Sequence, residues 1–140
     1  MEFVGTYLNF PLKSEEAFNF YRDVFKPGSE YTLIKFADTP MAENLPEHER
    51  NGVMHAELEI LGGHKIFATD SLGSMGHEVK VGNNTTLSLN FDTREASDAI
   101  YSKLSQGASD NVAPHEEPWG YWGTCLDRYG IRWMFNVNNN

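Results

Sequence analysis

The sequence YLNFPLKSEEAFNFYRDVF, residues 7–25, changes from a strand pattern to a helix pattern and decides the fold. Residues 3–12 are short, aromatic and β-branched, which is typical of a strand. Ser14 and the two acids after it form the pattern of a helix start. Apolar residues then recur at three- and four-residue spacing, at Ala17, Phe18, Tyr21, Val24 and Phe25, until Pro27 and Gly28. The stretch therefore predicts a strand followed by an amphipathic helix.

Three more strands are predicted after this helix. Residues 30–38 and 53–61 have strand patterns, and residues 64–70 follow a Gly62-Gly63 turn, which favours an antiparallel hairpin. Residues 39–52, between the first two of these strands, are polar and include two prolines. They predict a long loop of the kind that often covers a site. The first half of the chain is thus expected to have the order β-α-β-β-β.

The second half repeats this order after a polar, glycine-rich linker, residues 71–84. A strand at 85–92 precedes a helix at 94–106, which Asp92 or Thr93 caps and Gly107 ends. We expect one side of this helix to be buried, with Ala96, Ala99, Ile100 and Leu104. Three further strands are predicted, at about 108–117, 121–127 and 131–137.

An internal duplication explains the repeated order. The tripeptide LNF at 8–10 recurs at 89–91. The helix tyrosines Tyr21 and Tyr101 are separated by nearly the same number of residues as these two tripeptides. We therefore expect a single domain, residues 1–140. It consists of module one, at about 1–72, and module two, at about 84–140.

Composition and charge limit the classes of function. The chain has 140 residues, 40% of them hydrophobic, which suits one folded domain with a core. Its net charge of −9 repels nucleic acid, so we expect no nucleic-acid partner. No run approaches the roughly 18 apolar residues of a membrane span, Cys125 is the single cysteine, and no basic-then-apolar leader follows Met1. We expect a cytoplasmic protein that does not bind membranes.

Several enzyme motifs are incomplete in the sequence. The His-Glu pairs that begin at His48, His77 and His115 lack the second histidine of a zinc-protease helix. The stretch GSMG at 73–76 lacks the first glycine of a serine-nucleophile elbow. No glycine-rich phosphate loop is present. These classes of enzyme are excluded.

The strand at 53–61 and the aromatic loop at 118–123 contain the candidate functional residues. Apolar and polar residues alternate along the strand: Met54, Ala56, Leu58 and Ile60 against His55, Glu57 and Glu59. His55 and Glu57 therefore project from one face, close enough to share a ligand or a metal ion. A solvated outer face, or a histidine hydrogen-bonded within the sheet, explains the same pattern. Trp119 beside Gly120 can present a flat apolar surface to a ligand, and it equally suits a core or a sheet edge.

Five segments together resemble the PhnB-like branch of the vicinal oxygen chelate superfamily, whose other members include glyoxalases, extradiol dioxygenases and bleomycin-resistance proteins. The segments are YLNFPLKSEEAFNFYRDVF, VMHAELEI, the strand that ends Ala68-Thr69-Asp70, LSLNFDTREASDAIYSKLSQG and PWGYWGTCLDRYGIRWMFN. The last segment is the most specific, and the resemblance covers nearly the whole chain. It implies an α+β fold in which two βαβββ modules form curved mixed sheets around a cavity. It also implies a homodimer.

The resemblance further implies where a metal ion would bind. Superfamily enzymes usually hold a divalent metal with one His or Glu from the first strand and one from the last strand of each module. The matching positions in this chain are Thr6, Phe67, Thr86 and Met134. None is a good ligand for a divalent metal, and shifting the alignment by one residue recovers no histidine or carboxylate. We therefore expect no metal ion and no other cofactor.

Three functions remain open. The first is a metal-free cavity that binds a small organic molecule, with or without catalysis by His55, Glu57 or Asp70. The second is a divalent-metal-dependent isomerase, lyase or dioxygenase with a displaced site at His55 and Glu57, completed by Asp70 or His115. The third is a non-enzymatic subunit that contacts other proteins. For the first function we expect the ligand between the sheets, in contact with His55, Phe67, Trp119, Trp122 and Met134.

Overall fold

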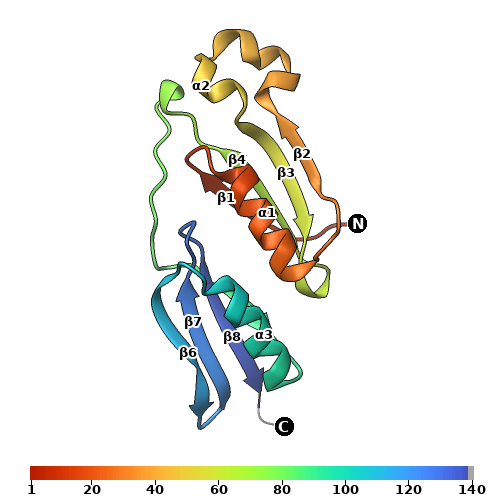
Figure 1. Cartoon of the computed structure of the whole chain (residues 1–140), viewed down its shortest axis with the longest axis vertical. Helices are drawn as coiled ribbons and strands as arrows, with labels where there is room; N and C mark the ends of the chain where they lie inside the picture. Colours follow the sequence, from red (N-terminus) through yellow and green to blue (C-terminus); the bar gives the residue numbers. More distant parts are fainter. Residues whose placement is uncertain (139–140) are drawn as a thin grey trace. The chain divides into compact units, whose positions relative to one another are not determined.

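The order of elements expected from the sequence, β-α-β-β-β twice over, is the order in the computed structural model of the chain (Figure 1). The structure describes residues 1–138. These residues form two units, unit 1 at 1–80 and unit 2 at 81–138, each with an open four-stranded mixed sheet. The predicted α+β class with two βαβββ modules is confirmed. No helix within residues 1–138 is both long enough and apolar enough to cross a membrane.

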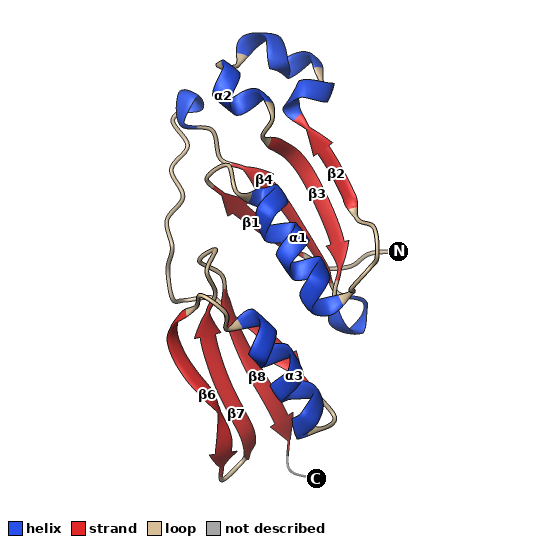
Figure 2. Cartoon of the chain, in the orientation of Figure 1, coloured by secondary structure: helices blue, strands red, loops and turns tan. Residues whose placement is uncertain are grey.

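Unit 1 is a sheet with the strand order β1-β4-β3-β2. Strand β1 (Thr6–Phe10) is parallel to β4 (Lys65–Asp70), whereas β3 (Val53–Glu59) is antiparallel to β4 and to β2 (Thr32–Lys35). Helix α1 (Ser14–Phe25) lies on one face of the sheet (Figure 2). The core of unit 1 therefore lies between α1 and the sheet, where the fully buried aromatic side chains are Phe10, Phe18 and Tyr21.

Unit 2 has the same topology, which agrees with an internal duplication. Strand β5 (Leu87–Asn90) is parallel to β8 (Arg132–Asn138), and the strand order is β5-β8-β7-β6. Strands β6 (Ser109–Glu117) and β7 (Gly120–Leu126) complete the antiparallel part. Helix α3 (Arg94–Leu104) packs against β8 and β6. The core residues beneath α3 are Leu89, Leu104, Cys125, Trp133 and Phe135.

The buried side of α3 differs from the expected one. Ala96 and Ala99 are exposed, and the buried or half-buried positions are Ser97, Ile100, Tyr101 and Leu104. These four positions follow the spacing of a single helix face. The Tyr101 ring contacts the Phe135 ring edge to face, with ring centres 5.2 Å apart. This aromatic contact, and not burial of the small alanines, determines which face of α3 is turned toward the sheet. The predicted cap is confirmed for Thr93, whose hydroxyl accepts the backbone N–H of Ala96 at 3.1 Å.

The segment between β2 and β3, expected to be a long loop, consists of short helical turns. They are η1 (Phe36–Asp38), η2 (Pro40–Asn44) and α2 (Glu47–Arg50). The buried carboxylate of Glu49 accepts hydrogen bonds from the backbone N–H and the hydroxyl of Ser74, in the turn η4 (Gly73–Met75). The Ser74 hydroxyl lowers the pKa of Glu49 and so keeps the buried group ionised. These bonds hold the segment against the loop that follows β4.

Asp70 joins three elements of unit 1 through its buried carboxylate. Oδ1 accepts the backbone N–H of Ser14 at 2.9 Å and the Ser14 hydroxyl at 2.6 Å, and Oδ2 accepts the backbone N–H of Val53 at 2.8 Å. Ser14 was expected to cap α1 with its own side chain, but it is the first residue of the helix and donates to Asp70. A carboxylate from β4 therefore accepts from the N-terminus of α1, where a helix favours negative charge.

We predict that Asp70→Ala destabilises the protein by about 3 kcal/mol, because it leaves the buried donors of Ser14 and Val53 without an acceptor. Urea unfolding at neutral pH, followed by circular dichroism, measures the change. Asp38→Ala, at an exposed position of the same unit, is the control and should change stability by less than about 0.5 kcal/mol. Equal stability of the two variants would show that the Asp70 contacts do not hold unit 1 together.

Candidate functional site

The face of the unit 1 sheet that is turned away from α1 carries aromatic and charged side chains. The strand register places them, since Tyr7 is opposite Phe67 and Phe67 is opposite Glu57. We name this surface the open face of unit 1; its residues are Tyr7, Asn9, His55, Glu57, Lys65, Phe67 and Thr69. The residues that alternate with them are buried under α1 and include Leu8, Ala56, Leu58, Ile66 and Ala68. The alternation of His55 and Glu57 with apolar residues is therefore confirmed.

Met54 departs from this alternation because of a bulge. Ile34 pairs with His55, but the next residue, Lys35, pairs with Val53. Met54 is thus the extra residue on β3, and a bulge turns such a side chain away from its regular position. It packs against a small buried cluster, Phe36, Leu45 and Leu72, and not under α1.

Aromatic rings gather at the centre of the open face of unit 1. Tyr7 stacks on Phe67 with ring centres 6.0 Å apart and an interplanar angle of 15°. The His55 imidazole lies 5.9 Å from the Phe67 ring and 6.3 Å from the Tyr7 ring. Phe3 adds a fourth ring, 6.3 Å from Phe67. Phe3 and Tyr7 are 57% and 53% exposed, so this apolar surface is accessible within its own unit.

The charged groups beside these rings already pair with one another. Lys65 Nζ donates to Glu57 Oε1 at 2.7 Å, and His55 Nε2 lies 3.9 Å from Glu57 Oε2. The Lys65 ammonium lowers the pKa of Glu57, and Glu57 in turn raises the pKa of Lys65. Glu57 is therefore an ionised carboxylate whose Oε1 already binds a cation, and a metal ion at that oxygen would have to displace Lys65.

The structure does not bring the three proposed catalytic candidates together. Asp70 lies at the end of β4 on the α1 side of the sheet, whereas His55 and Glu57 are on the open face. Both carboxylate oxygens of Asp70 already accept hydrogen bonds, from Ser14 and Val53. Among residues 1–138, no group of three or more His, Cys, Asp or Glu side chains is placed to hold a metal ion. Asp70 thus has a structural role in unit 1 and does not complete a site at His55.

The positions that would hold the superfamily's metal do not fit one either. Thr6 pairs with Ile66, which is buried under α1, so Thr6 is on the opposite face from Phe67, and its hydroxyl is hydrogen-bonded to His64 Nε2 at 2.9 Å. Tyr7, the residue that follows Thr6, is the one that lies opposite Phe67. Met134 of unit 2 pairs with Ser88, and Thr86 precedes β5. A phenol, a phenyl ring, a thioether and a hydroxyl do not form the His and carboxylate set of such a metal site.

The corresponding surface of unit 2 is also aromatic. We name it the open face of unit 2; its residues are Val112, His115, Glu117, Trp122, Thr124, Arg132 and Met134. The Trp122 ring contacts the His115 ring and the Trp119 ring edge to face, at 5.9 and 6.4 Å. Trp119 lies in the turn between β6 and β7, as predicted, and is 58% exposed. Cys125 faces the other way, into the core, where burial raises the pKa of its thiol to about 12 and keeps it protonated.

His115 makes two hydrogen bonds that both require a ring N–H. Nδ1 lies 2.9 Å from the carbonyl oxygen of Ala113, and Nε2 lies 2.7 Å from Oε1 of Glu117. Both partner atoms are acceptors, so the imidazolium, with two N–H groups, makes both bonds. The Ala113 carbonyl, and after it the Glu117 carboxylate, raise the pKa of His115. The open face of unit 2 therefore favours a positive charge at this position.

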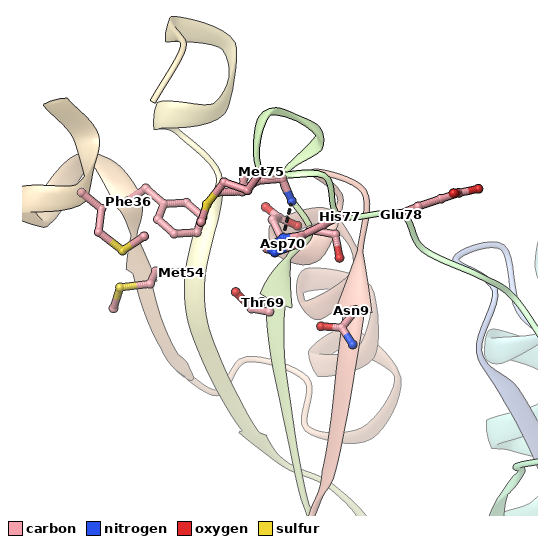
Figure 3. A pocket seen from close by; sticks show the side chains of 11 residues that line it. Asn9, Phe36, Met54, Thr69, Asp70, Met75, His77 and Glu78 are labelled. Atoms are coloured by element: carbon pink, nitrogen blue, oxygen red, sulfur yellow. Dashed lines mark hydrogen bonds between the residues drawn. The ribbon is translucent and has the colours of Figure 1, made fainter. Parts of the chain in front are cut away.

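A pocket that the sequence analysis did not identify lies at one end of the open face of unit 1 (Figure 3). Its volume is about 580 Å³. The lining residues come from the strand ends, the segment of helical turns and the loop after β4: Asn9, Phe36, Met41, Met54, Thr69, Asp70, Ser71, Leu72, Met75, His77 and Glu78. The signal in the sequence was the segment 39–52, expected to cover a site, because Met41 belongs to it.

We predict that His115 titrates above the ordinary imidazole value of 6.5 in an NMR titration. Its pKa should fall part of the way back in Glu117→Gln, since the Ala113 carbonyl remains, and should not change in the control Glu116→Gln. Because the folded-state pKa is the higher one, His115 stabilises the fold fully below about pH 6.5, and the contribution is lost as the pH rises through the folded-state pKa. A pKa at or below 6.5 in the unmodified protein would contradict the two-acceptor geometry.

Comparison with known proteins places the chain in a family. A family model described as 3-demethylubiquinone-9 3-methyltransferase matches residues 2–135. No curated protein matches the chain. Among solved structures, a protein from Pseudomonas aeruginosa has 24% sequence identity and a TM-score of 0.83, with 100% of both chains covered. The PhnB protein from Bacillus cereus has 25% identity and a TM-score of 0.77, with 97% of this chain and 99% of that chain covered.

A more distant structure shares the fold. It is a glyoxalase/bleomycin resistance protein/dioxygenase domain from Frankia, with 13% identity and a TM-score of 0.62 over 99% of this chain and 97% of that chain. The vicinal oxygen chelate fold implied by the sequence is therefore confirmed. Since the family model covers nearly the whole chain, this protein belongs to the 3-demethylubiquinone-9 3-methyltransferase family, and the PhnB-like resemblance of the sequence is confirmed.

Proposed function

We propose that this protein binds a small organic molecule on the open faces of its sheets without using a metal ion. One observation carries the proposal: accessible stacked rings, Tyr7 and Phe67, surround an imidazole, His55, on a face that α1 leaves uncovered. Ligand sites in proteins combine an apolar surface with a few polar groups that fix orientation. The open face of unit 1 has both components.

The energetics support a planar or apolar ligand on this face. A ligand that covers the exposed parts of Phe3 and Tyr7 gains roughly 25 cal/mol of binding free energy for each Å² of apolar surface removed from water. Aromatic stacking adds about 0.5–1.5 kcal/mol for each ring pair beyond that area term. The imidazole of His55, beside these rings, supplies a hydrogen bond for a polar group of the ligand.

Unit 2 offers a second surface of the same kind. Trp119, Trp122 and Met134 present flat and polarisable apolar groups on its open face or in the adjoining turn. Tryptophan gives a large contact area at a low cost in conformational entropy. We propose Trp119, Trp122 and Met134 as the ligand contacts of unit 2, and His55 and Phe67 as those of unit 1.

The turn after β1 does not fit the methyl transfer for which the family is named. The turn after β1 is Pro11-Leu12-Lys13, in which the backbone N–H of Leu12 donates to the Phe10 carbonyl at 3.1 Å. A methyl-donor cofactor bound at the end of a first strand needs a glycine-rich loop there, through which the backbone can approach it. The proline and leucine at this turn do not provide that approach.

We predict that the protein purified without chelators holds less than about 0.1 equivalent of zinc, nickel, iron or manganese. The reason is that Lys65 is bound to the Glu57 carboxylate, and the positions that hold the metal in superfamily enzymes have no His or carboxylate side chain in this chain. Elemental analysis by mass spectrometry gives the ratio directly. About one tightly held equivalent, lost in His55→Ala, would establish the displaced metal site at His55 and Glu57 instead.

We predict that Tyr7→Ala weakens binding of a planar aromatic compound to unit 1 about 3- to 10-fold, since it removes one ring of the stacked pair. A panel of neutral, anionic and cationic naphthalene derivatives, tested by NMR, finds the compound, and shifts of the His55 and Phe67 resonances locate it. Leu61→Ala, at an exposed apolar residue in the turn between β3 and β4, is the control and should bind normally. If no member of the panel shifts an open-face resonance at about millimolar concentration, the proposal is wrong.

A further inference from the structure

The pocket of unit 1 continues the open face of that unit. Asn9 pairs with Thr69 in the sheet register, one same-face step beyond the stacked pair Tyr7 and Phe67. Two residues along a strand span roughly 6.6 Å, about the width of one aromatic ring. A ligand that lies on the Tyr7 and Phe67 rings therefore extends directly into the pocket.

Soft apolar side chains form one side of the pocket. Figure 3 shows Phe36, Met54 and Met75 on that side, and Met41 also lines it. Met75 is 56% exposed and Met41 is 40% exposed, so their thioethers are not buried by packing within the unit. Methionine side chains are flexible and polarisable, and they make favourable contacts with aromatic and aliphatic ligands. This wall suits an apolar molecule.

Hydrogen-bond donors are present on the other side. His77 Nδ1 accepts the backbone N–H of Leu72 at 3.3 Å, so the neutral ring carries its proton on Nε2, as a donor. The exposed amide of Asn9 supplies two further N–H groups. Asp70 also lines the pocket, but both oxygens of its carboxylate already accept hydrogen bonds, from Ser14 and Val53. The available groups thus suit a ligand oxygen that accepts hydrogen bonds.

The charges around the pocket disfavour an anion. Glu78 lies at the rim and points away from the other lining side chains (Figure 3), and the chain carries a net charge of −9. No lysine or arginine is among the lining residues, all of which lie within residues 1–138. A carboxylate or phosphate would therefore meet a negative field without a cation to offset it. A neutral oxygen acceptor avoids this cost.

We propose that the pocket binds the carbonyl-bearing part of a neutral, apolar molecule, with the carbonyl oxygen accepting from His77 Nε2 and the Asn9 amide. The apolar part lies against the methionines and Phe36. This assignment rests on the small-molecule binding proposed above and specifies its ligand class. Three matched probes separate the components: 2-acetylnaphthalene has the neutral carbonyl, 2-isopropenylnaphthalene is its hydrocarbon isostere, and 2-naphthoate is the anion.

The test uses the full chain labelled with ¹³C at its five methionine methyl groups. We expect 2-acetylnaphthalene to shift the Met41, Met54 and Met75 signals, and to bind about 3- to 10-fold more tightly than its hydrocarbon isostere and than 2-naphthoate. Met134, in unit 2, reports binding at that unit's open face. His77→Phe and Asn9→Ala should each remove most of the preference for the ketone over the hydrocarbon. His48→Phe, at an exposed histidine outside the pocket, is the control.

Each other outcome has a definite meaning. Asn9→Ala is at an exposed position and keeps the test valid if His77→Phe unfolds the loop around Leu72. Equal affinity for ketone and hydrocarbon, or a preference for 2-naphthoate, would overturn the assignment of a neutral carbonyl. Ketone binding that shifts His55 or Met134 but none of the pocket methionines would overturn the pocket assignment and leave the proposed function intact. The absence of binding by all three probes would overturn the assignment, and the wider panel of charged compounds would then decide the proposed function.

Discussion

A four-stranded sheet with a single covering helix leaves the side chains of one face uncovered by the helix. In unit 1, α1 covers the face that carries Leu8, Ala56 and Ala68, and within Met1–Lys80 no second helix covers the other face. Because side chains alternate along a strand, the residues between these core positions must occupy that uncovered face. In this chain several of them are aromatic. The candidate site is therefore a direct consequence of the layer arrangement, and the residue types on the open face give it its chemistry.

A buried carboxylate organises the helix side of the sheet in each unit. Asp70 connects the start of α1 to β3 and β4 through Ser14 and Val53. In unit 2, Asp127 Oδ1 accepts the backbone N–H groups of Tyr129 and Ile131 at 2.8 and 3.0 Å, and Oδ2 accepts Trp133 Nε1 at 2.8 Å. These contacts form the turn into β8 and fix the buried Trp133.

The sequence predicted the elements well where local patterns are decisive and poorly where contacts between distant segments decide. The strand, helix and turn order followed from periodicity and caps, and the placement of His55 and Glu57 followed from alternation. Met54 left that alternation because of a bulge against β2, which the sequence of β3 alone does not encode. Thr6, which the resemblance matched to a metal position, pairs with the buried Ile66, and this pairing joins strands about 60 residues apart, so the sequence of β1 alone does not show it.

The segment 39–52 was expected to cover a site, but the full lining of the pocket could not have been predicted, for the same reason. Its lining comes from strand ends, from the turns around Phe36 and Met41, and from the loop that Glu49 holds through Ser74. The sequence shows only that these residues are apolar or polar, not that they meet. Likewise, Asp70 was a catalytic candidate in the sequence because the residue type alone does not distinguish a buried structural carboxylate from a reactive one. Only its three hydrogen bonds distinguish the two roles.

Metal-free binding at the open faces is the central claim, and one comparison tests it most directly. Calorimetric titration with a neutral aromatic ketone would be carried out on the protein as purified, on protein treated with a chelator and dialysed, and on the dialysed protein supplied with zinc, nickel or manganese. The account predicts the same affinity and stoichiometry in every case, because the contacts are aromatic rings, thioethers and hydrogen-bond donors of the chain itself. Binding that disappears with the chelator and returns with one of the metals would contradict it.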